Sequence, residues 1–102
     1  VIGVVPVGYG DGYRRGLSNN CFALVHGEPV PVVGRVSMDM ITVDLTALPE
    51  LPEIGEEVVL IGSQEWRGRR ATLSAEEMAE RLDTISYEIT CGLTPRVPRV
   101  YL

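Results

Sequence analysis

The chain of 102 residues has the length of about one domain, and its composition, 45% hydrophobic and 23% charged, is that of a globular protein. A formal net charge of −5 disfavours binding to the phosphate backbone of a nucleic acid. The sequence has neither the roughly 20 apolar residues that span a bilayer nor a signal peptide. We therefore expect a cytoplasmic domain without a nucleic-acid or membrane partner. Because the chain begins at Val1, inside an apolar run, we also expect it to be a fragment.

The residue types exclude several chemistries. All 9 basic residues are arginines, so the chain has no lysine for a Schiff base or a P-loop. Its one histidine, His26, cannot form a two-histidine metal site. Cys21 and Cys91 fit no metal-ligand spacing, and we interpret both as free, buried thiols. No metal site is expected.

Several segments are rich in β-branched residues or alternate between apolar and polar side chains, as strands do. The predicted strands are residues 1–7, which we expect to be largely buried, 21–26, 30–36, 40–45, 57–61 and 85–90. A hairpin turn is predicted at 26–29, an irregular connector over 46–55 and a charged hairpin loop over 64–70. Residues 93–102 contain prolines and predict an edge strand or an extended tail.

One helix is predicted, and it begins after Ser74. Ser74 and Glu77 have the spacing of a capping box, and Met78, Ala79 and Leu82 recur at helical spacing. Short strands with regular turns and a single helix predict a mainly β fold, a small antiparallel β-barrel or sandwich with one short α-helix.

Two segments combine glycines with hydrogen-bonding side chains. Residues 8–15 contain tyrosines, an aspartate and arginines on a glycine-rich turn, which is either a binding loop or a tight turn with solvated arginines. In residues 34–40, Arg35 and Asp39 flank Met38. A guanidinium at this place could pair with a carboxylate in bidentate fashion. Alternatively, Arg35 and Asp39 are a surface pair of little energetic weight, with Met38 and Met40 in the core.

Two aromatic residues also have more than one interpretation. Tyr87 shares a face of the predicted strand with Ile85 and Ile89, which is typical of a core residue, although its hydroxyl could reach a phosphate. Trp66 stands among arginines as in a nucleic-acid patch, but in an acidic protein a charged hairpin tip is the favoured interpretation.

Taken together, four motifs in order resemble the C-terminal β domain of alanine racemase. They are residues 2–15, 33–40, 84–88 and 96–99, and the similarity runs through the whole chain, so that residues 1–102 form one such domain. The resemblance implies an N-terminal (β/α)₈ barrel, outside this sequence, whose lysine holds pyridoxal 5'-phosphate. The absence of lysine here agrees with that division.

The resemblance also implies the reaction. Alanine racemases interconvert L- and D-alanine for peptidoglycan as homodimers, in which the C-terminal domain meets barrel domains of its own and the partner subunit. A lysine of the barrel and a tyrosine upstream of the Gly-Tyr-x-Asp-Gly motif move the proton. Both lie outside this sequence, so we expect no catalytic residue in it and no activity from it alone.

Motif by motif, the resemblance assigns binding roles to seven residues. The backbone of Met38 corresponds to a contact with the substrate carboxylate, and the Tyr87 hydroxyl to a contact with the cofactor phosphate. The expected lining of the substrate entrance corridor is Tyr9, Arg15 (with Arg14 as an offset alternative), Arg35, Asp39 and Ile85.

Two other functions stay open. One is a racemase of serine or another amino acid with the same domain, because the side-chain pocket lies partly in the barrel. The other is a β-barrel ligand or interaction module without catalytic function.

Overall fold

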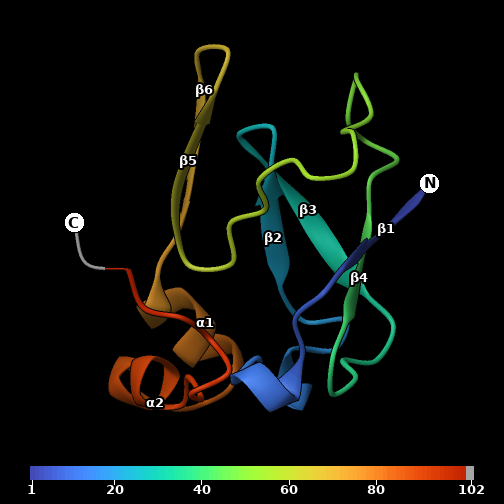
Figure 1. The fold of residues 1–102 in the computed structure, drawn as a ribbon. Helices are drawn as coiled ribbons and strands as arrows, with labels where there is room; N and C mark the ends of the chain where they lie inside the picture. Colours follow the sequence, from blue (N-terminus) through green and yellow to red (C-terminus); the bar gives the residue numbers. More distant parts are fainter. Residues whose placement is uncertain (101–102) are drawn as a thin grey trace.

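The structure is a computed structural model that describes residues 1–100, and it is mainly β, as predicted (Figure 1). Four antiparallel strands form a sheet in the order β1-β4-β3-β2, and a two-stranded hairpin, β5–β6, packs near β2 and β3. The two antiparallel sheets confirm the sandwich alternative, and they do not close into a barrel within residues 1–100. The elements are β1 (Ile2–Val5), η1 (Tyr9–Asp11), η2 (Arg15–Leu17), β2 (Phe22–Val25), β3 (Glu28–Val33), β4 (Ile41–Asp44), β5 (Gly62–Trp66), β6 (Arg69–Leu73), α1 (Ala75–Arg81) and α2 (Ser86–Cys91).

The core lies between the sheet, the end of β6 and helix α1. Alternation along β4 directs Ile41 and Val43 inward, as predicted. These residues join a cluster that includes the fully buried Leu24 of β2 and Leu73 of β6. Met78 of α1 closes the cluster from the helical side. The same apolar side chains therefore hold the sheet, the hairpin and the helix together.

Local chemistry explains the elements that were predicted correctly. The turn between β2 and β3 consists of His26 and Gly27, both with positive φ (54° and 69°), which matches the twist of a tight hairpin. Helix α1 begins after Ser74, whose hydroxyl oxygen accepts a hydrogen bond of 3.1 Å from the backbone N–H of Glu77. Neither α-helix within residues 1–100 has the length and hydrophobicity that crossing a membrane requires.

The β5–β6 hairpin is attached to the main sheet through an aromatic stack. The rings of Trp66 and His26 lie 3.9 Å apart and are nearly parallel, at 6°. His26 Nε2 lies 3.1 Å from both carboxylate oxygens of Glu56, which follows directly after the predicted connector. Hydrogen bonding from the Glu53 backbone N–H and then from His26 lowers the pKa of Glu56. The hairpin loop predicted over 64–70 is mostly strand, because the turn itself occupies only residues 67–68.

Two segments form different structure from the prediction. Residues 85–90, predicted as a strand, form helix α2 after Ile85, and only Ile89 of its apolar residues is buried. Six residues with apolar side chains at alternate positions do not distinguish a strand from a short helix. Residues 57–61 form only an isolated bridge, in which Val59 pairs with Leu24.

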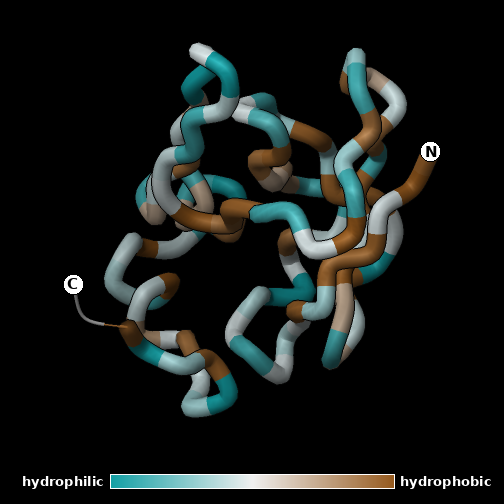
Figure 2. The backbone as a smooth tube through the Cα atoms, turned by 45° about the horizontal axis from the view of Figure 1, so that its top comes forward, coloured by the Kyte–Doolittle hydropathy of each residue, from teal (hydrophilic) through white to brown (hydrophobic). Residues whose placement is uncertain are grey.

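Exposure was predicted wrongly in two places. Strand β1 is an edge strand with alternating exposed and half-buried residues, although Figure 2 shows that its sequence is strongly hydrophobic at the N-terminus. Within residues 1–100 its partner strand is β4 alone, and the side chains of Ile2 and Val4 are 56% and 63% exposed. Of the two free cysteines, Cys21 is buried, whereas Cys91 at the end of α2 is exposed.

Candidate functional site

Three segments that are distant in sequence meet at the end of the molecule near the helices: residues 8–15, 34–40 and 92–97. We call this region the three-segment junction. The backbone N–H of Tyr9 donates to the carbonyl oxygen of Ser37, and that of Gly10 to the carbonyl of Met38, both at 3.0 Å. Thr94 ties in the third segment, because its hydroxyl donates to the Gly10 carbonyl at 2.7 Å. Hydrogen bonds to the backbone thus fix the relative positions of both predicted binding loops.

Glycines permit this close approach. A Cβ at position 8 would overlap the carbonyl oxygen of Ser37, so the two loops can pair only when residue 8 has no side chain. Gly12 has a φ of 110°, and a Cβ there would overlap the carbonyl oxygen of Gly92. The Asp11 carboxylate closes the turn by accepting a hydrogen bond of 2.9 Å from the Gly8 N–H. The glycine-rich segment is therefore a tight turn built to contact two other segments.

A bridging arginine adds charge pairing to the junction. Arg96 Nη2 lies 2.6 Å from Asp39 Oδ1, and Arg96 Nε lies 3.3 Å from Asp11 Oδ1. Its hydrogen bond with Asp39 and, after it, the charge of Asp11 raise the pKa of Arg96 above its ordinary value. The predicted pairing of Asp39 with Arg35 is therefore wrong. Arg35 is exposed and forms no ion pair within residues 1–100.

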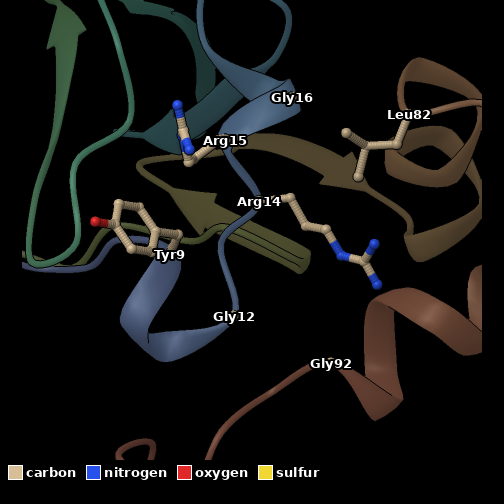
Figure 3. A pocket seen from close by; sticks show the side chains of 7 residues that line it. All are labelled: Tyr9, Gly12, Arg14, Arg15, Gly16, Leu82 and Gly92. Carbon is tan, nitrogen blue, oxygen red and sulfur yellow. The ribbon is translucent and has the colours of Figure 1, made fainter.

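An open cavity of about 470 Å³ lies beside the junction (Figure 3). Its lining residues are Tyr9, Gly12, Arg14, Arg15, Gly16, Leu82 and Gly92. The Arg15 guanidinium lies over the Tyr9 ring at 5.9 Å, within the range of a cation–π contact. Arg14 points the other way, toward the helices, and donates to the Glu88 carbonyl of α2 at 3.3 Å. The two adjacent arginines thus face different surroundings, and only Arg15 is paired with Tyr9.

The junction contains five of the seven residues that were predicted to bind: Tyr9, Arg15, Arg35, Met38 and Asp39. Met38 and Met40 are 48% and 47% exposed, so the alternative that placed them in the core is wrong. The backbone N–H of Met38 has no hydrogen-bond acceptor in the described part of the chain, although the Met38 carbonyl is bonded to Gly10. The N–H groups of Arg35 and Asp39 likewise have no acceptor among residues 1–100, so the loop presents three unused backbone donors. That of Met38 belongs to the residue whose carbonyl is tied to Gly10.

Two more predicted residues are Ile85, which precedes helix α2, and Tyr87 within it; they are 62% and 75% exposed. The interpretation of Tyr87 as a core residue is therefore wrong. No hydrogen bond in residues 1–100 involves its hydroxyl, so this group is free to donate to an external acceptor such as a phosphate oxygen. The chain could therefore supply one hydroxyl donor to a pyridoxal phosphate site. It could not supply the whole site, because it has no lysine for a Schiff base.

Sequence reasoning missed the role of Arg96. The residue lies in the motif of residues 96–99, but nothing in that spacing pointed to Asp11 or Asp39, which come from two other loops. No group of three or more potential metal ligands occurs among residues 1–100.

Comparison with known proteins gives a consistent result. Residues 1–101 match the model of the family described as alanine racemase, C-terminal domain. The alanine racemase of Halothermothrix orenii is 50% identical over 100 residues, and alanine racemase 2 of Bacillus subtilis is 48% identical over 102 residues. These matches cover 98% and 100% of the chain but only 25% of each relative, so the chain spans about a quarter of their length.

Solved structures agree. The chain resembles alanine racemase from Bartonella henselae with covalently bound pyridoxal phosphate, with a TM-score of 0.87 and 35% identity over 99% of the chain and 26% of that protein. It also resembles alanine racemase from Bacillus anthracis with bound L-Ala-P, with a TM-score of 0.85 and 40% identity over 99% of the chain and 24% of that protein. The chain belongs to the alanine racemase C-terminal domain family.

Proposed function

We propose that residues 1–102 are the C-terminal domain of a pyridoxal-phosphate-dependent alanine racemase, a cytoplasmic homodimer that forms D-alanine for peptidoglycan. Family membership over residues 1–101 supports this assignment. In this proposal, different domains of the enzyme supply the binding groups and the catalytic groups. Because these 102 residues contain no lysine, the Schiff-base lysine belongs to another part of the enzyme. We assign the proton-transfer tyrosine to another part as well, on the strength of the family resemblance.

The observation that carries the proposal is the unused backbone N–H of Met38, on a loop whose position is fixed by hydrogen bonds to residues 8–12. A carboxylate accepts strong hydrogen bonds from backbone N–H groups. We assign this donor to the carboxylate of the amino-acid substrate. Because both loops are tied together, the donor needs no reorganisation when substrate arrives.

The surrounding side chains suit a zwitterionic amino acid. We assign Tyr9, Arg15, Arg35, Asp39 and Ile85 to the entrance corridor, and all five are exposed in this structure. Guanidinium groups attract the substrate carboxylate, whereas Asp39 attracts its ammonium group. The Tyr9 ring, held beside Arg15, narrows the passage to small substrates.

The Tyr87 hydroxyl is assigned to the cofactor phosphate. When bound, pyridoxal phosphate supplies an electron sink that lets the α-proton of an amino acid leave. Tyr87 would donate one hydrogen bond to a phosphate oxygen and so help to retain the cofactor. Helix α2 holds this side chain at the surface, anchored by the buried Ile89 and by the bond between Arg14 and Glu88.

The decisive experiment compares the full-length enzyme with residues 1–102 alone. With pyridoxal phosphate and L-alanine, we expect the full-length protein to form D-alanine and to sediment as a dimer, and we expect no turnover by the isolated domain. L-serine, offered in parallel, tests the alternative substrate. Preference for serine would reassign the substrate. Racemisation by the isolated domain would contradict the assignment of the catalytic groups to other parts of the enzyme. A full-length holoenzyme that racemises no amino acid would favour a non-catalytic binding module.

A further inference from the structure

Arg96 is the one side chain in residues 1–100 that forms ion pairs with both loops of the junction. Its guanidinium reaches Asp39 in residues 34–40 and Asp11 in residues 8–15. Thr94, two residues earlier, is bonded twice to the second of these loops, through its N–H to the Asp11 carbonyl at 3.1 Å and through its hydroxyl to the Gly10 carbonyl. The segment that carries Arg96 is therefore itself held in place.

The two carboxylates differ in how firmly they are fixed. Asp11 is 13% exposed, and its second oxygen is occupied by the Gly8 N–H. Asp39 is 57% exposed, and Arg96 is the only partner of its side chain within residues 1–100. Arg96 thus connects a fixed carboxylate to one that nothing else restrains. Without the guanidinium, two like charges would converge with no cation between them.

The backbone beneath the guanidinium is shaped to receive it. A Cβ on Gly10 would overlap Arg96 Nη1, so the guanidinium lies directly against the glycine backbone. The same glycine donates its N–H to the Met38 carbonyl. The bridge therefore lies next to the hydrogen bond that sets the position of Met38.

We propose that Arg96 is a positioning residue: by bridging Asp11 and Asp39, it holds residues 34–40 so that the Met38 N–H and the Asp39 carboxylate meet the amino-acid substrate. The proposal rests on the proposed function. Arg96 itself touches no reacting atom. Its loss should weaken substrate binding and leave the chemical step unchanged, which raises KM at constant kcat.

The test uses the full-length holoenzyme with three variants. Arg96→Gln removes the bridging charge, and Arg96→Lys keeps a charge that can hold one carboxylate but not both in the forked geometry. Arg67→Gln is the matched control. It removes an exposed arginine in the turn of the distant β5–β6 hairpin, where Arg67 Nη1 lies 2.8 Å from Glu50 Oε2. Two quantities are measured: KM and kcat for L-alanine, and hydrogen–deuterium exchange of a peptide covering residues 34–40.

For Arg96→Gln we expect KM to rise about three- to tenfold, as for the loss of half-exposed ion pairs, with kcat within about twofold of the parent. Exchange in residues 34–40 should become faster, whereas cofactor content and Tm stay unchanged. For Arg96→Lys we expect a KM and an exchange rate between those of the parent and of Arg96→Gln. Arg67→Gln should have the KM and exchange rate of the parent.

Unchanged KM and exchange in Arg96→Gln would overturn the proposal. So would a parallel loss of kcat, cofactor and Tm, which would show that Arg96 supports the fold generally. If the parent enzyme racemises no amino acid, the proposed function fails, but the exchange measurement still decides whether Arg96 holds residues 34–40.

Discussion

The buried half of the sheet and the three-segment junction are stabilised by different means. Strands β2, β3 and β4 are held by apolar side chains that are almost completely buried, such as Leu24 and Ile41. In the junction, only Tyr13 and Val36 of residues 8–15, 34–40 and 92–97 belong to the buried core cluster. It is held together mainly by hydrogen bonds to backbone atoms, by the close approach that Gly8, Gly10 and Gly12 permit, and by the half-exposed Arg96.

This difference separates stability from binding. Burial of a large apolar side chain contributes about 1.5–3 kcal/mol, whereas exposed polar contacts contribute much less to stability but fix directions accurately. The sheet therefore supplies the free energy of folding, and the junction supplies geometry. Substitutions in the two regions should affect different measurements.

The largest loss of stability is expected for Leu24→Ala. Leu24 is fully buried at the centre of the core cluster, and truncation of such a residue costs about 2–5 kcal/mol. Urea unfolding should show this loss, whereas Val4→Ala on the exposed edge strand should change stability by less than about 0.5 kcal/mol. Equal effects of the two substitutions would contradict the placement of the core.

Tyr87→Phe should act on the cofactor and not on the fold. If the hydroxyl donates to the phosphate, its removal weakens retention of pyridoxal phosphate by about 1.5–3 kcal/mol, the range for a hydrogen bond to a charged group. The side chain is 75% exposed, so Tm of the cofactor-free protein should not change. Cofactor release from the full-length enzyme, followed by absorbance, measures the effect. Unaltered affinity would remove Tyr87 from the site.

Gly8→Ala should separate the two loops of the junction. The new Cβ would meet the Ser37 carbonyl, which is backbone and cannot rotate away, and we expect a cost of about 1–3 kcal/mol. Gly16→Ala is the control, because its Cβ would meet only the flexible end of Leu82. Thermal unfolding compares the two variants. A similar Tm for both would show that the loops tolerate a wider spacing.

Tyr13→Phe should stabilise the protein. The Tyr13 hydroxyl is buried, and it has no hydrogen-bond partner within residues 1–100. Burial, with a smaller contribution from Cys21, raises the pKa of Tyr13 far above its ordinary value. Removing an unpaired buried hydroxyl should raise the free energy of unfolding by about 1 kcal/mol. A loss of similar size would reveal a partner for this group.

The smallest effect is expected for Glu56→Gln, which should change how the free energy of unfolding depends on pH. Because the pKa of Glu56 is lower in the folded protein than in the unfolded chain, its contribution to stability is present above the ordinary carboxyl pKa. That contribution is lost as the pH falls from the ordinary carboxyl range through the lowered pKa of the folded protein. The parent should therefore have a higher unfolding midpoint than Glu56→Gln at neutral pH, and this difference should shrink at acidic pH. A constant difference across this range would exclude the linkage.

The buried half was largely predictable from local sequence. The alternation of residues 40–45, the turn at His26 and Gly27, and the Ser74 cap each depend on neighbouring residues alone. Helix α2 was predicted wrongly because its short pattern of apolar residues fits the periodicity of a strand as well as that of a helix. The ion pairs of Arg96 could not be predicted, since its partners come from two distant loops. Long-range charge pairing depends on topology, which residue spacing does not encode.

The stacked pair at the hairpin gives the domain an internal optical probe. Trp66 is the sole tryptophan and His26 the sole histidine of the chain, and the two rings are in contact. The indole emission of the isolated domain would therefore report whether the β5–β6 hairpin is attached to the sheet. The same signal would be insensitive to opening of the loops around Met38. An unfolding curve followed by fluorescence alone would describe one side of this molecule and miss the side that we propose to bind substrate.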